Sequence, residues 1–236
     1  MKPYQQIPIL ECGEPLVPIP LELFAVESPH PYAKVGAPYG ERSPYYLRES
    51  VLDSLLQAQS QLQLHYPNWR IQIFDAYRPV EVQQFMVDYT FRETAKAQGL
   101  HPDNLTEEQR QEILEQVYQI WAIPSFDFAT PPPHSTGGAV DVTLVDDEGN
   151  PVDMGSPIDE MSLRSLPDYY ANSTDPIEQQ YHADRQLLKD IMIWANFIRH
   201  PNEWWHFSQG DQLWAWLVNQ ENPTNPIKAR YGRADQ

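Results

Sequence analysis

The chain has a single cysteine among its 236 residues and no long apolar run. Because one cysteine cannot form an intramolecular pair, Cys12 excludes a disulfide framework and fits a reducing compartment. It also leaves any metal ion to His and carboxylate ligands. No apolar stretch is long enough for a signal peptide near the start or for a bilayer span further on, so we expect a cytoplasmic protein.

Positive charge is also scarce. The 16 Lys and Arg residues face 33 Asp and Glu residues, which gives a net charge of −17. Nucleic acids and anionic membranes repel such a chain, so neither is expected as a partner, and solubility is the simpler explanation of the charge. The length suits one domain, without repeats or a clear linker. We expect a Pro-rich wrapping segment over 1–44, a core over 45–220 and a tail over 221–236.

The segment 1–44 holds nine of the 23 prolines, which predicts an extended stretch that packs beside the functional site. Apolar spacing and capping signals predict the helices. These cover Leu47 to Leu62, residues 80–97, the stretch between the Thr106/Gln109 capping box and Pro124, a helix opened by Asp175-Pro176, and residues 210–219. Alternating residues predict strands over 69–75 and 139–145. The segments 124–133 and 146–174 are loop-rich and flank the motifs described next.

The first motif is His134-Ser-Thr-Gly-Gly-Ala-Val-Asp141. Gly137 and Gly138 predict a turn, because glycine adopts backbone conformations that other residues avoid. In the strand that follows, Val140 and its alternate neighbours form an apolar face. Asp141 therefore points to the opposite face, where it can meet His134 across the turn.

The second motif is Glu203-Trp-Trp-His206. Pro201 argues against a helix, and the aromatic residues favour a strand with Glu203 near its entrance. On a regular strand Glu203 and His206 would face opposite ways. A turn or bulge at Glu203 is therefore required if both side chains are to reach one site.

A third segment, Asp75-Ala-Tyr-Arg-Pro79, ends a predicted strand and leaves Arg78 on the loop after it. Catalytic zinc sites usually have three protein ligands and leave a fourth position for water. His134, Asp141 and His206 could be those ligands, with Glu203 as general base and Arg78 as oxyanion partner. Each residue alone also has a structural explanation: a hydrogen-bonded His, a turn Asp or a solvated Arg.

Taken together and in this order, the three segments resemble the signature of the VanX-type D-alanyl-D-alanine dipeptidases, over roughly residues 69–208. That family belongs to a group of zinc peptidases that includes the hedgehog signalling domain. The resemblance implies an α+β fold with a central antiparallel sheet, flanking helices and one zinc ion. It also implies that His134, Asp141 and His206 bind zinc, that Glu203 is the base, and that Arg78 stabilises the transition state.

The sequence departs from the family pattern at several positions. Pro132 stands where family members often carry a Ser that holds the substrate, and the family's N-terminal pattern is replaced by His30-Pro-Tyr-Ala-Lys-Val-Gly-Ala-Pro-Tyr39. Tyr32 and Tyr39 are still candidates to line the pocket. Asp159 lies in a segment similar to one whose aspartate holds the substrate's amino group, although a solvated loop acid is an equal alternative. Trp204 shares a predicted strand face with His206 and is a candidate pocket wall.

The remaining aromatic and imidazole side chains are interpreted as structural. Trp214 and Trp216 are typical packing groups. Five histidines lie outside the motifs and are expected at the surface or in structural roles; these are His30, His65, His101, His182 and His200. His200, close to the second motif, is the nearest rival as a ligand.

The leading hypothesis is a cytoplasmic zinc dipeptidase that hydrolyses D-alanyl-D-alanine or a related short D-amino-acid peptide through a metal-activated water. Two alternatives stay open. One is a D,D-carboxypeptidase or L-alanyl-D-glutamate endopeptidase acting on peptidoglycan peptides of the cell wall. The other is a zinc-containing binding module without catalysis, which the presence of Glu203 disfavours.

Overall fold

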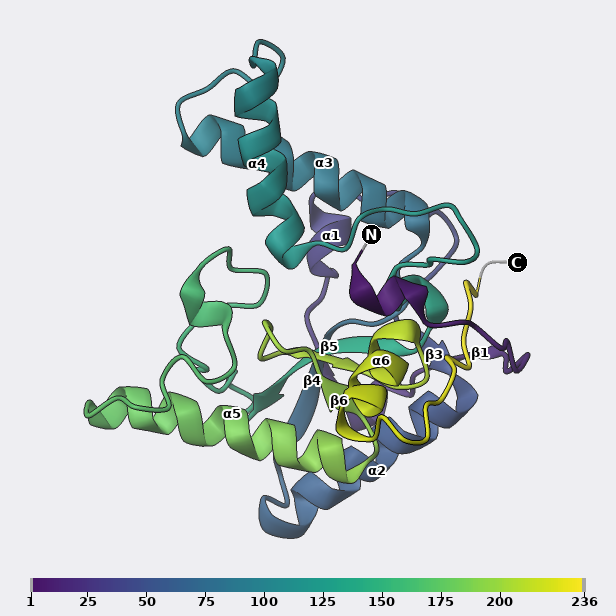
Figure 1. Cartoon of the computed structure of the whole chain (residues 1–236). Helices are drawn as coiled ribbons and strands as arrows, with labels where there is room; N and C mark the ends of the chain where they lie inside the picture. The colour runs from purple at the N-terminus through teal and green to yellow at the C-terminus, as the bar shows by residue number, and fades with distance from the viewer. Residues whose placement is uncertain (1, 235–236) are drawn as a thin grey trace.

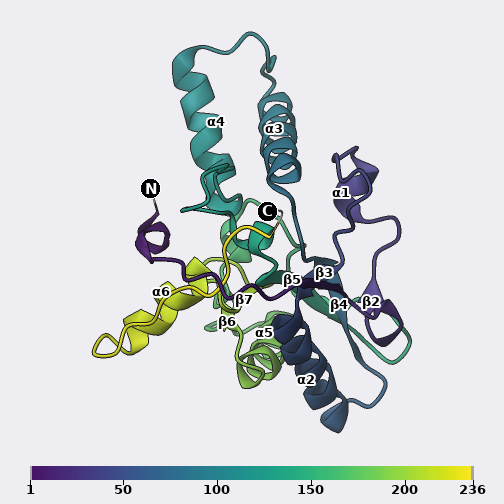
Figure 2. The same cartoon turned by 90° about the vertical axis from the view of Figure 1, so that its right-hand side faces the viewer.

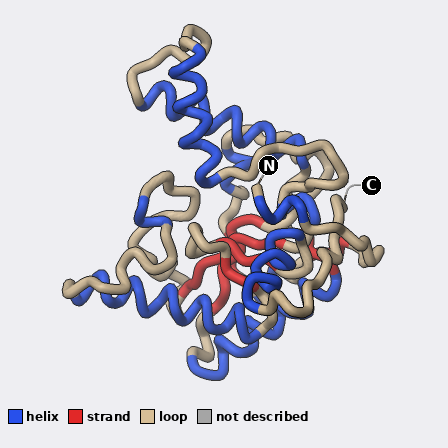
Figure 3. Tube along the Cα trace, viewed as in Figure 1, coloured by secondary structure: helices blue, strands red, loops and turns tan. Residues whose placement is uncertain are grey.

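The computed structural model describes residues 2–234, and a five-stranded sheet lies at its centre (Figures 1 and 3). The sheet order is β2-β4-β5-β7-β6, made of Ala25–Val26, Arg70–Asp75, Ala139–Val145, His206–Ser208 and Ile198–Arg199. Its neighbouring strands are antiparallel, except that β2 runs parallel to β4. A separate antiparallel ribbon joins β1 (Leu16–Pro18) to β3 (Tyr46–Arg48). The predicted α+β class, with a mainly antiparallel central sheet, is confirmed.

One face of the sheet is apolar, and α2 (Glu49–His65) and α5 (Pro176–Trp194) cover it (Figure 2). Ile71, Ile73 and Val142 are fully buried in this layer with side chains from both helices. Fully burying a side chain of this size stabilises the fold by about 1.5–3 kcal/mol. Because strand residues alternate between faces, this packing sends Asp141 to the other side of the sheet.

Above that other side, α3 (Val80–Ala97) and α4 (Glu107–Ile120) form a helical hairpin that rises from the sheet (Figure 2). A second apolar cluster joins the two helices to Tyr32 of α1 (Pro31–Lys34). The 3-10 helix η1 (Pro3–Gln6) packs on α6 (Gln212–Glu221), where the Gln212 side chain donates to the Ile7 carbonyl at 2.7 Å. The other 3-10 helices are η2 (Leu21–Leu23), η3 (Pro133–Thr136) and η4 (Leu163–Ser165).

The predicted helices agree closely with the structure. The helix expected over 80–97 is α3, and the capping box exists, with Gln109 N donating to Thr106 Oγ1 at 3.2 Å and Thr106 N to Gln109 Oε1 at 2.9 Å. Asp175 caps α5 by accepting from Ile177 N at 2.7 Å. One prediction is wrong: Leu47 is not helical, because β3 pairs it with Val17 and α2 begins only at Glu49.

Within residues 2–44 the helices and strands are short, and the segment supplies β1 to the ribbon and β2 to the edge of the sheet. The expected division into 1–44, 45–220 and 221–236 stays a prediction, and residues 1, 235 and 236 lie outside the described part. No helix of residues 2–234 combines the length and the apolar character that a membrane span requires.

Candidate active site

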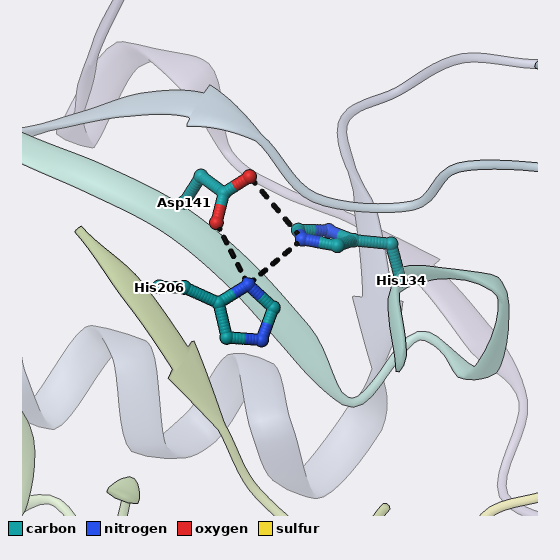
Figure 4. A group of neighbouring side chains, drawn as sticks. All are labelled: His134, Asp141 and His206. Atoms are coloured by element: carbon teal, nitrogen blue, oxygen red, sulfur yellow. Dashed lines mark hydrogen bonds and ion pairs between the residues drawn. The ribbon is translucent and has the colours of Figure 1, made fainter. Parts of the chain in front are cut away.

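Three side chains meet on the polar face of the sheet: His134, Asp141 and His206 (Figure 4). Asp141 of β5 is directly opposite His206 of β7, and directly opposed residues point to the same face. His134 reaches them from η3 through the predicted glycine turn, where Gly137 is left-handed with φ of 72°. A Cβ on Gly138 would lie 2.6 Å from the Gln209 carbonyl, so this close approach of backbones also requires glycine.

The donor atoms of the cluster converge. Asp141 Oδ1 lies 2.9 Å from His206 Nδ1, Asp141 Oδ2 lies 3.2 Å from His134 Nε2, and the two imidazole nitrogens are 3.2 Å apart. Tetrahedral zinc with bonds of 2.0–2.2 Å would hold its ligand atoms about 3.4 Å from one another. All three side chains are buried. The donor types and their spacing therefore fit a single divalent metal ion.

Hydrogen bonds behind the cluster orient both imidazoles. His134 Nδ1 lies 2.7 Å from the Ala76 carbonyl, which can only accept, so Nδ1 carries the proton and Nε2 presents its lone pair. Ser208 Oγ donates to Asp211 at 2.8 Å and lies 3.2 Å from His206 Nε2. Since the hydroxyl proton is already used, His206 Nε2 donates to Ser208. Nδ1 of His206 is then free toward the metal position, as partners behind metal-binding histidines typically arrange.

Glu203 lies beside this cluster without belonging to it. Its Oε2 is 3.9 Å from His206 Nδ1, and the carboxylate accepts no hydrogen bond within residues 2–234. β7 begins only at His206, so Glu203 lies before the strand, directly after the turn at 201–202, and alternation does not separate the two side chains. The turn required by the sequence is present. Burial, together with the charge of Asp141, raises the pKa of Glu203 well above its usual range.

Arg78 is held in the same pocket by a buried network. Its Nε donates to Asp75 at 2.9 Å, one terminal nitrogen donates to Gln83 at 2.8 Å, and the other lies 3.4 Å from Asp141. Its guanidinium also packs 4.9 Å from the ring centre of Trp121. Because these contacts fix it in place, the Arg78 guanidinium is a preorganised cationic group that needs no rearrangement during a reaction.

Asp159 reaches the pocket from the loop after β5. Its Oδ2 accepts from the Tyr32 hydroxyl at 2.8 Å, and that hydroxyl accepts from Arg78 at 3.2 Å. Desolvation, reinforced by the charge of Asp141, raises the pKa of Asp159 to about 7. Tyr39 lies one layer further back, where its hydroxyl donates to Asp75 at 3.2 Å.

Trp204 does not share a strand face with His206, and that expectation is wrong because β7 starts after it. Its indole nitrogen instead donates to Ser156 at 3.0 Å, and its ring lines a different cleft. Trp205 lines the pocket in its place.

Further pocket-lining residues escaped the sequence reasoning: Lys2, Tyr4 and Gln83. Nothing in the sequence signals Lys2 or Tyr4, which are separated from the motifs by more than seventy residues. Gln83 could have been found, because it follows Arg78 by little more than one helical turn. His200 lies 3.5 Å from Glu203 Oε1 but outside the donor cluster.

A buried cluster of two histidines and an aspartate, beside a carboxylate that does not join it, is the arrangement of a metallopeptidase. Comparison with known proteins agrees. The chain belongs to the D-ala-D-ala dipeptidase family, whose model matches residues 26–227.

Two proteins of similar sequence bear the same description, and a solved structure resembles the fold. A D-alanyl-D-alanine dipeptidase of Synechocystis sp. is 55% identical over 242 residues, covering 100% of this chain and 98% of its own. A D-alanyl-D-alanine dipeptidase of Escherichia coli is 45% identical over 74 residues, 31% of this chain and 36% of its own. Among solved structures, the vancomycin-resistance D,D-pentapeptidase VanY in complex with Zn(II) has a TM-score of 0.44 and 17% identity, and covers 75% of this chain and 80% of its own.

Proposed function

We propose that this protein is a zinc-dependent dipeptidase that hydrolyses D-alanyl-D-alanine or a closely related short D-amino-acid peptide. The observation that carries the proposal is the donor cluster with Glu203 unbonded beside it in one buried pocket. The full-length similarity to a D-alanyl-D-alanine dipeptidase supports the choice of substrate.

His134, Asp141 and His206 would hold one zinc ion. When bound, zinc supplies a Lewis acid that lowers the pKa of water and polarises a carbonyl. Glu203 is the general base: it takes a proton from the attacking water and then donates that proton to the leaving amine. This role requires a carboxylate near the metal position whose oxygens are not already engaged. Among the other carboxylates lining the pocket, Asp141 belongs to the donor cluster and Asp159 accepts a hydrogen bond from Tyr32.

Arg78 is the group that meets developing negative charge on the substrate carbonyl. Asp75 and Gln83 hold its guanidinium, so it needs no rearrangement as the charge develops. Removing a single donor of this type from a comparable site typically costs about 10²–10³ in kcat.

Asp159 is the partner we propose for the substrate's free amino group. An ammonium ion in a largely closed site requires a carboxylate, and the charge-assisted hydrogen bond between them is strong. A peptide extended at its amino end would leave Asp159 unpaired, which disfavours longer substrates. The Tyr32 hydroxyl orients the carboxylate from the opposite side.

The proposal is tested by hydrolysis of a peptide panel that varies chirality and chain length, with and without a chelator. We expect cleavage of D-alanyl-D-alanine, little cleavage of L,L-dipeptides or of muropeptide-length substrates, and loss of activity that added zinc restores. Preference for the longer peptides would point to a carboxypeptidase or endopeptidase. Zinc-loaded protein that cleaves nothing in the panel would leave a binding module as the function.

We also propose that the protein works in the cytoplasm on a small peptide. The lone cysteine supports this location, and the acidic composition argues against a nucleic-acid partner. Fractionation of cells that express the untagged chain would test it, and recovery outside the cytoplasm would contradict it.

A further inference from the structure

The charges around the pocket leave one cation without a partner. The lining includes two basic side chains, Arg78 and Lys2. The Arg78 guanidinium is engaged by Asp75, Gln83 and Tyr32. By contrast, the Lys2 ammonium makes no hydrogen bond and no ion pair with any residue in the range 2–234. A half-buried ammonium that is left unpaired in a pocket is available to an anionic ligand.

The backbone of Lys2 is well anchored, so its side chain enters the pocket from a defined place. Lys2 N donates to Gln5 Oε1 at 2.8 Å, and Gln5 N donates to the Lys2 carbonyl at 3.1 Å. Tyr4 is buried, and Gln212 ties η1 to α6. η1 lies beside α6, close to β7 and on the opposite side of the helical hairpin from α1 (Figures 1 and 2).

Lys2 lies on the Glu203 side of the pocket. It lines the pocket together with Glu203 and His200, and it lines the adjoining cleft together with Asn202, the residue before Glu203. Asp159 is held beside Arg78 by Tyr32 of α1, and α1 lies across the helical hairpin from η1 (Figure 2). The pocket therefore presents a carboxylate toward one end of a bound peptide and an ammonium toward the other.

The reaction geometry says which end of the substrate meets Lys2. Glu203 returns its proton to the leaving nitrogen, which belongs to the C-terminal residue of the dipeptide. The α-carboxylate of that residue is separated from this nitrogen by a single carbon atom. An ammonium on the Glu203 side of the pocket therefore lies toward that carboxylate.

We propose that Lys2 binds the C-terminal carboxylate of the dipeptide and so selects substrates that end at that residue. The inference rests on the proposed dipeptidase function and adds a specificity residue to it. Lys2 and Ile120 line both the inner pocket and an outer cleft that Met161 and Leu163 also line. A peptide extended at its C-terminus would have to pass Lys2 into that cleft without offering it a charge. Lys2 thus limits the substrate at the end opposite to Asp159.

The test compares D-alanyl-D-alanine with its C-terminal amide, using wild type, Lys2→Met, Lys2→Arg and the exposed control Lys228→Met, all zinc-loaded and with native N-termini. A lost charge-assisted contact lowers binding by about tenfold to a hundredfold. We expect Lys2→Met to raise KM for the acid by at least tenfold and to lower the acid-to-amide ratio of kcat/KM equally. Lys2→Arg should recover part of this ratio, and Lys228→Met should match wild type.

The acid-to-amide ratio separates recognition from structure. A Lys2→Met variant that is folded and zinc-loaded but loses acid and amide turnover equally would overturn the proposal, because a general defect does not depend on the substrate's charge. An unchanged ratio would overturn it too. If zinc-loaded wild type cleaves neither substrate, the dipeptidase function itself has failed. That outcome differs from an active wild type whose preference for the acid over the amide is unchanged by the Lys2 substitution.

Discussion

Replacing Glu203 with glutamine keeps the shape of the side chain and removes its ability to accept a proton. Of the other two pocket carboxylates, Asp141 belongs to the donor cluster and Asp159 accepts from Tyr32, so neither replaces it as base. General acid–base catalysis contributes about 10²–10⁴ in rate. Because Glu203 would act twice in each turnover, we expect kcat to fall by about 10³ or more, equivalent to at least about 4 kcal/mol of barrier.

Metal binding should survive this substitution. Glu203 is outside the donor cluster, and its Oε2 is 3.9 Å from the nearest ligand nitrogen. The assay measures D-alanine release at saturating D-alanyl-D-alanine together with zinc content per chain. Glu112→Gln, an exposed change on α4, is the matched control. Turnover above a tenth of wild type would refute the role of Glu203 as base, and loss of zinc would show that it acts as a ligand.

The Glu203→Gln substitution should also change how the stability of the metal-free protein depends on pH. Burial raises the pKa of Glu203 in the folded chain above its unfolded value, so the folded state binds the proton more tightly. Metal-free wild type therefore loses stability as pH rises above the unfolded pKa of about 4.3. Glutamine cannot ionise, so metal-free Glu203→Gln should lose less stability than wild type between pH 5 and pH 8. Thermal unfolding in chelator measures this, and parallel curves would contradict it.

Three further predictions concern the surroundings of the site. Ser208→Ala removes the acceptor behind His206 and should weaken zinc binding by about 10–100-fold in a competition titration, whereas unchanged affinity would exclude a supporting role. The pKa of Asp159 is raised to about 7, so ionisation above that pH should strengthen binding of the substrate's ammonium; wild-type kcat/KM should rise from pH 6 to pH 8, and Asp159→Asn should lack the part of that rise due to KM. Gly138→Ala would place a Cβ 2.6 Å from the Gln209 carbonyl and should cost about 1–3 kcal/mol in urea unfolding, with a neutral result showing that the turn relaxes.

Helix caps and the buried face of the strands could be predicted from the sequence because their causes are local. The capping box of Thr106 and Gln109 forms as expected, since the two residues are one helical turn apart and satisfy each other's backbone groups. The alternation in β4 and β5 assigned the apolar face correctly, because one face of the sheet must be buried. The error at Leu47 has a non-local cause: pairing with Val17 in a distant strand overrides helical spacing.

The candidate active site was likewise predictable from the sequence only in part. The sequence predicted the chemistry of His134, Asp141, His206 and Glu203 from residue types and order, while the place where β7 begins decided that Glu203 and His206 reach one pocket. That boundary also sent Trp204 to a different cleft.

By itself, the sequence determined the kinds of groups available to this protein: two imidazoles and an aspartate suited to a metal ion, a spare glutamate, and an arginine held after a strand. Only the tertiary structure decided how these groups are connected and which others join them. The contacts of Arg78 with Tyr32 and of Tyr32 with Asp159, and the entry of Lys2 into the pocket, link segments far apart in the chain. Such contacts depend on how helices and strands pack, and no local pattern of residues encodes that packing.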